Sequence, residues 1–126
     1  MNLFPTSDTL KGVCWIFCSH DDFSEVESLC AGFDSGLNLV VLSERTDSDR
    51  PRRNSSVCAV VDKDKAFGLA RRLGVQLKDL PQTIADSMEE WNSIACPTPE
   101  HVRDCFKEIT DRLSDEGCRY TIRHNP

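Results

Sequence analysis

Cys18 and His20 are the residues of this chain whose types and spacing could support covalent chemistry. A thiol two positions from an imidazole could act as a nucleophile, with His20 as its base or cationic neighbour. Asp21 and Asp22 follow at once, and repulsion from these carboxylates disfavours the thiolate form of Cys18. Because small buried cysteines are common and inert, we interpret Cys18 as a structural residue at a strand end and keep the nucleophile as the alternative.

The same short segment also carries metal-binding side chains, namely His20, Asp21 and Asp22. Three adjacent ligands rarely converge on an ion without partners from elsewhere in the chain. The other histidines, His101 and His124, lie at a predicted helix start and in the tail. We therefore predict no metal site and no cofactor, and we interpret the acids as helix-start residues that favour the helix dipole.

Short apolar runs predict the strands that must position this segment. They cover residues 12–18, 37–42 and 57–61. Residues 44–56 are polar and have no helical periodicity, so we expect a loop there. In the tail, residues 118–123 alternate between apolar and polar side chains and predict an edge strand with one solvated face.

Apolar stripes at helical spacing predict three helices, over residues 24–33, 62–73 and 98–113. The first begins with a capping box at Ser24, and the last begins with Thr98 followed by proline. After Pro81, two short strand candidates, residues 82–86 and 91–96, predict an antiparallel pair.

The composition describes one folded unit. The 126 residues are 39% hydrophobic, which is enough for one core and too little for two. Seven cysteines without a close pair favour reduced thiols over a disulfide framework. The net charge of −6 disfavours nucleic-acid binding, and no apolar run reaches the length of a membrane span. We expect a single cytoplasmic domain over residues 1–126, with neither a nucleic-acid nor a membrane partner.

The segment from Val57 to Ile84 carries a loose motif. Its residues are Val61, Asp62, Asp64, Ala70, Gly74, Val75, Pro81 and Thr83. In this order they resemble the second half of a thioredoxin-like domain of the peroxiredoxin and TlpA-type branch. The resemblance implies a three-layer α/β/α sandwich with a mixed sheet, to which the tail adds an extra C-terminal edge strand. It also implies a cis Leu80–Pro81 bond that presents backbone to an extended ligand. A receiver-like doubly wound sheet is the rival, but it needs a helix within residues 44–56, where Pro51 and the polar sequence oppose one.

The resembled family places a reactive cysteine after its first strand, whereas this chain has Asp22 and Glu25 there and no Cys-x-x-Cys at all. The resemblance therefore implies a redox-inactive protein that binds a protein or peptide partner through the loop after strand one and the Leu80–Pro81 turn. The residues expected to contact that partner are His20, Asp21, Asp22, Leu80, Pro81 and Trp91.

Two alternatives remain open from the sequence. The first is an enzyme, a single-cysteine thiol-disulfide oxidoreductase or peroxidase that uses Cys18, although the acidic loop favours a non-catalytic role. The second is a small acidic inhibitor or immunity-type protein that covers a basic active site. Its acidic surface would comprise Asp21, Asp22, Glu25 and Glu27. The tail strand also leaves open edge pairing into a homodimer.

Overall fold

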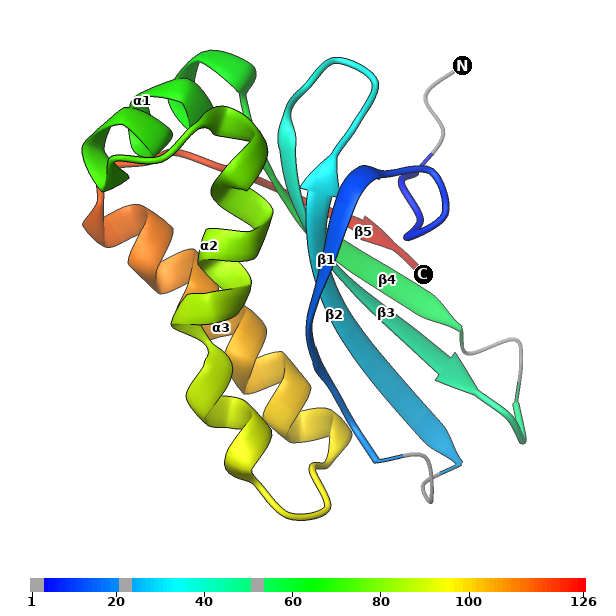
Figure 1. Ribbon diagram of the computed structural model, residues 1–126. Helices are drawn as coiled ribbons and strands as arrows, with labels where there is room; N and C mark the ends of the chain where they lie inside the picture. Colours follow the sequence, from blue (N-terminus) through cyan, green and yellow to red (C-terminus); the bar gives the residue numbers. More distant parts are fainter. Residues whose placement is uncertain (1–3, 21–23, 51–53) are drawn as a thin grey trace.

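The computed structural model describes residues 4–20, 24–50 and 54–126 (Figure 1). Its five strands form one sheet in the order β1-β2-β3-β4-β5, and each strand is antiparallel to its neighbours. The strands are β1 (Lys11–Cys18), β2 (Glu25–Phe33), β3 (Leu39–Asp47), β4 (Ser55–Val61) and β5 (Thr121–Asn125). The helices are α1 (Lys63–Leu73), α2 (Leu80–Ser87) and α3 (Pro99–Asp115), with short 3-10 helices η2 (Leu77–Asp79) and η3 (Glu89–Ser93).

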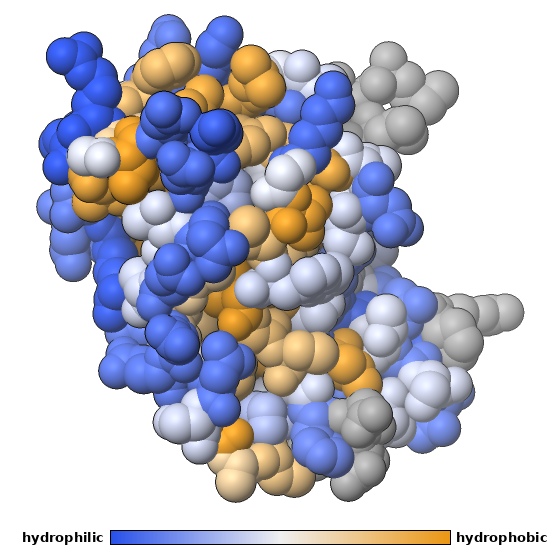
Figure 2. Space-filling model, in the orientation of Figure 1, coloured by the Kyte–Doolittle hydropathy of each residue, from blue (hydrophilic) through white to orange (hydrophobic). Residues whose placement is uncertain are grey.

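The helices all lie on one face of the sheet, so the molecule has two main layers (Figure 1). Helix α2 packs on β1 and β2, and α3 packs on the three strands β1 to β3. Hydrophobic residues fill the seam between α2 and β1 (Figure 2). On the other face, the amino-terminal segment around Phe4 and Leu10 covers a smaller apolar cluster that includes Val40 and Leu42. The thioredoxin-like three-layer sandwich with a mixed sheet is therefore wrong.

Strand β2 is the main cause of that error, because residues 24–33 were expected to form a helix. Val26, Leu29, Cys30 and Phe33 fit a helical stripe, but a strand buried on both faces also shows apolar residues at almost every position. From Leu29 to Phe33 every residue of β2 is buried, and β2 pairs with β1 on one side and with β3 on the other.

Pro81 is the second correction. The described residues contain no cis peptide bond, and Pro81 lies in the first turn of α2, where its missing N–H leaves no helical hydrogen bond unmade. Residues 82–86 therefore belong to a helix, and η3 occupies the start of the other expected strand, residues 91–96.

Other local predictions are confirmed. Strands β1 and β4 contain two of the apolar runs and β3 overlaps the third, but the loop expected at residues 44–56 is wrong at residues 44–47 and 55–56, which extend β3 and β4. Gly74 ends α1 with a φ of 72°, and Thr98 caps α3 in a capping box with His101. The tail forms an edge strand as expected, although β5 begins at Thr121 and not at Cys118, and it pairs only with β4 in the sheet order.

None of the seven cysteines, all of which lie within the described residues, takes part in a disulfide. Burial raises the pKa of Cys30 and of Cys105 to about 12, so both thiols stay protonated and behave as small core residues. Within the described part of the chain, no helix has the length and apolar composition needed to cross a membrane.

Candidate functional site

A groove of about 490 Å³ lies on the helix-covered side of the sheet, between α3 and strands β3 to β5. Its apolar walls come from Val57, Phe106 and Ile122. This volume lies within the range of roughly 300–1,000 Å³ that is typical of ligand sites. The groove forms because the helices pack over β1, β2 and β3 and leave the β5 margin of the sheet less covered.

The strand register explains why polar side chains meet in this groove. Residues directly opposite each other in antiparallel strands project from the same face, and so do residues two positions apart along one strand. Two neighbouring rows cross the sheet on the helix side at this end. One row contains Glu27, Arg45 and Ser55. The other contains Ser43, Val57 and His124.

Glu27, Arg45 and Arg103 line the groove and form its charged floor, and their ion pairs extend to Glu25 outside the lining. Arg103 Nη1 of α3 lies 2.6 Å from Glu27 Oε1, and Arg45 Nη2 lies 2.6 Å from Glu25 Oε2. Arg103 also lies 3.7 Å from Glu25, so the four side chains form one network. The network contains two acids and two bases and has no net formal charge.

Glu27 is the most buried ionisable member of this network. The residue is only 3% exposed, and burial raises the pKa of its carboxyl although the Arg103 guanidinium opposes the change. Its backbone is also fixed, because its N–H donates to Ser19 Oγ at 2.9 Å and its carbonyl accepts from the Ser19 N–H at 2.8 Å. Arg45 keeps one donor unused, since its Nε is buried with no hydrogen-bond acceptor among the described residues.

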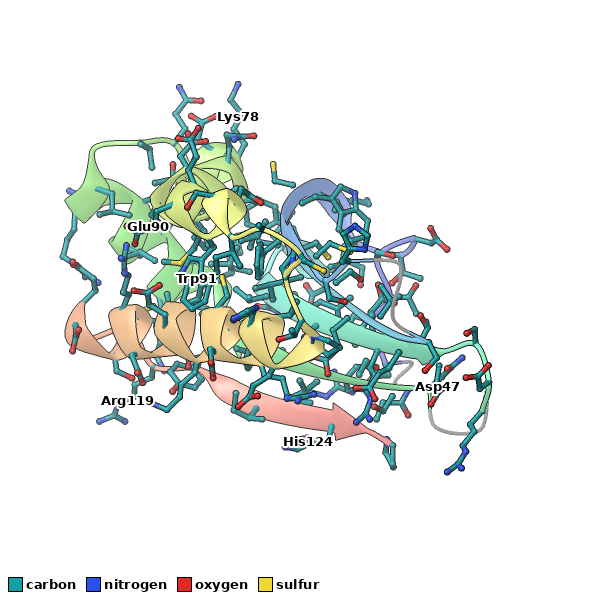
Figure 3. The ribbon with its side chains drawn as sticks, turned by 90° about the horizontal axis from the view of Figure 1, so that it is seen from below. Asp47, Lys78, Glu90, Trp91, Arg119 and His124 are labelled. Carbon is teal, nitrogen blue, oxygen red and sulfur yellow. The ribbon has the colours of Figure 1, made fainter. Side chains whose placement is uncertain are left out.

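The groove opens beside the outer edge of β5. This edge has no partner strand among the described residues, since β5 ends the sheet order. Figure 3 shows β5 along the margin of the molecule beneath α3, with His124 on the strand and Arg119 before its start. The site thus joins a groove for side chains to a strand whose outward backbone N–H and C=O groups can pair.

Of the residues predicted from the sequence, Cys18 lies away from the groove. Cys18 is exposed at the end of β1, which is the opposite edge strand of the sheet. His20 donates its backbone N–H to the Pro97 carbonyl at 2.8 Å. Asp21 and Asp22 lie outside the described residues.

Leu80 and Pro81 do not form an exposed turn, because both side chains are less than 2% exposed in the core. Trp91 lies in η3, where its indole N–H donates to Glu108 Oε2 at 2.6 Å and its ring packs 5.8 Å from that of Phe17 (Figure 3). The structure therefore leaves no exposed Leu80–Pro81 turn for a partner to contact.

The expected acidic surface is also reduced. Glu25 and Glu27 are both engaged by arginines of the groove, so neither is a solvated acid available to cover a basic active site. The sequence reasoning missed Arg45, Arg103 and His124. Glu25 and Glu27 are two positions apart, so they share one face if residues 25–33 form a strand. The helix that we expected there hid this signal.

Comparisons with protein-family models, curated proteins and solved structures found no match for this chain. The groove and the β5 edge are the structural features that bear on function. Among the described residues, no group of three histidine, cysteine, aspartate or glutamate side chains is arranged to hold a metal ion.

Proposed function

We propose that this protein is a non-catalytic binding protein that takes up an extended segment of a partner protein as a sixth strand beside β5. This proposal keeps the partner-binding role expected from the sequence but moves its surface from the loop after β1 to the opposite edge of the sheet. The observation that carries it is the groove, which opens along an edge strand whose outer side has no partner among the described residues.

Strand addition uses both features of the site. Backbone hydrogen bonds to an edge strand supply affinity, and pockets for alternate side chains supply specificity. The five residues of β5 span about 17 Å at the usual rise per residue. A partner segment of similar length would send every second side chain towards the groove face, beside Ile122 and Phe106.

The state of Glu27 favours binding over catalysis. A general base must reach the proton that it abstracts. Glu27 is buried and held by Arg103, so its carboxylate is positioned to maintain the groove floor and not to meet a substrate.

Peptide display followed by NMR tests the proposal. Random seven-residue peptides would be selected on the wild-type protein, and one selected peptide would be titrated into labelled protein. We expect chemical-shift changes and slower amide exchange in β5, together with shifts of Phe106 and Ile122. Changes confined to β1 or to the loop after it would contradict the proposed site.

Two exposed hydrophobic residues on opposite edge strands supply matched variants for this test. Ile122 of β5 is 40% exposed and Trp15 of β1 is 58% exposed. We expect Ile122→Ser to weaken binding of the selected peptide about tenfold or more, because apolar anchors dominate interface affinity. Trp15→Ser should leave that affinity unchanged.

A further inference from the structure

We infer that the segment bound at β5 alternates acidic and apolar residues, with the apolar side chains in the groove and the acidic side chains on the opposite face of the sheet. This inference rests on the proposed function and names the chemistry of its partner. It depends on how charge is divided between the groove floor and the edge strand.

The segment that carries the edge strand has no acidic residue although the whole protein is acidic. Residues 117–126 contain Arg119, Arg123 and His124 and no aspartate or glutamate, whereas the chain has a net charge of −6. Arg119 and His124 are exposed. Because opposite charges across neighbouring strands attract and like charges repel, this edge favours a partner strand that carries carboxylates.

The two faces of β5 accommodate different side chains of a partner strand. On the groove face, Ile122 lies beside Val57 and Phe106, and the ion pairs of Glu27 with Arg103 and of Glu25 with Arg45 leave the floor neutral. An apolar side chain can enter there without burying an unpaired charge.

On the other face, Arg123 has its guanidinium 5.2 Å from the centre of the Phe4 ring, which holds it beside the edge. Side chains of a strand alternate between the two faces, so a segment that places apolar residues in the groove places the intervening residues beside Arg123. Carboxylates at those positions would complement its charge.

A second copy of this chain fits the edge less well. If β5 of one molecule paired with β5 of another in the antiparallel register centred on Arg123, the two Arg123 guanidinium groups would lie side by side on one face. Like charges that face each other across a strand pair are unfavourable. The observations therefore favour an acidic segment of a different protein over a homodimer through this strand.

Three synthetic peptides of one length test the inference: an alternating Glu-Val heptapeptide, and the same peptide with glutamine or with lysine in place of each glutamate. Affinity for the full-length chain would be measured by calorimetry at low and at high salt. We expect the glutamate peptide to bind at least tenfold more tightly than the glutamine peptide, and the lysine peptide to bind most weakly. High salt should reduce the preference.

Variants locate the effect on the edge. Arg123→Gln should remove most of the preference for glutamate, Arg123→Lys should retain most of it, and Lys11→Gln, an exposed basic residue on β1, should leave it intact. Melting curves of all three variants would confirm that each is folded.

The outcomes separate the inference from the proposed function. Equal affinity for the glutamate and glutamine peptides, lost in Ile122→Ser, would overturn the acidic partner and retain strand addition. Binding that is insensitive to Ile122→Ser, or no binding of any peptide, would overturn both. Sedimentation that reveals a dimer broken by Ile122→Ser would make a second copy the occupant and also overturn the inference.

Discussion

β1 and β5 are the two edges of one sheet, but only β1 is bulged and covered by a helix. Its register with β2 shifts twice, between Lys11 and Cys14 and between Trp15 and Phe17, and Gly12 lies within the first shift with a φ of 63°. Such bulges bend and twist an edge strand, which makes it a poor template for another strand.

Helix α2 adds a second protection to β1. It packs against this strand, and the Cys14 thiol donates to Gln82 Oε1 of α2 at 3.5 Å. β5 has neither protection, because it pairs with β4 in continuous register from Val60–Thr121 to Ser56–Asn125. The comparison indicates that β1 closes the sheet and that β5 is the edge at which a partner strand can add.

The largest expected effect on stability comes from helix α2, which packs on β1. Leu80 is fully buried in α2, so Leu80→Ala should lower the free energy of unfolding by about 2–5 kcal/mol because it leaves a cavity under this helix. Chemical denaturation would measure the change. The matched control is Leu73→Ala, at a leucine 43% exposed, which should change stability by less than about 1 kcal/mol. A Leu80→Ala variant of normal stability that loses peptide binding would instead restore Leu80 as a contact residue.

Loss of the Arg103 side chain beside the groove should lower stability less than Leu80→Ala does. Arg103→Ala leaves the carboxylate of Glu27 buried without its nearest partner, which should cost about 1–3 kcal/mol. Lys107→Ala, one turn further along α3, removes an exposed pair with Asp111 and should cost at most about 1 kcal/mol. Equal unfolding free energies for the two variants would mean that the Glu27–Arg103 pair does not hold the floor of the groove.

Glu27 should also make stability depend on pH. Its folded-state pKa is raised above the ordinary value of 4.5, so the protonated form is favoured by folding. That contribution is fully present below the unfolded pKa and is lost as pH rises through the folded pKa.

Glu27→Gln should therefore flatten the pH dependence of unfolding on the alkaline side of 4.5 and gain stability relative to the wild type as pH rises. Urea titrations at a series of pH values would measure this. The exposed Glu89→Gln variant should follow the wild-type curve. Parallel curves for the wild type and Glu27→Gln would show that Arg103 fully offsets the burial of the carboxyl.

The smallest expected effects are those of edge charges on stability. Arg123→Gln on β5 and Lys11→Gln on β1 should each change the free energy of unfolding by no more than about 1 kcal/mol, because a single cation–π contact of the half-buried Arg123 and the exposed charge of Lys11 contribute little. Thermal melts would measure both. A large loss in Arg123→Gln would make this residue part of the fold and would weaken its use as a probe of binding.

Local signals determined a substantial part of this structure. The stripe and the following Gly74 determined α1, Thr98 and the next proline determined α3, and short apolar runs determined strands β1, β3 and β4. The alternating tail likewise indicated that β5 would be an edge strand. Each of these signals depends on neighbours within a few positions, so the sequence alone contains them.

Tertiary structure decided what these signals left ambiguous. The apolar residues of β2 fit a helix or a strand buried on both faces, and only the helices on one side and the amino-terminal segment on the other make the strand the stable choice. Pro81 fits the entry of a strand or the first turn of a helix, and its burial against the sheet decides for α2. The groove depends most on contacts between residues that are far apart in the sequence. Glu27 and Arg103 are 76 positions apart and meet only because α3 packs across β2.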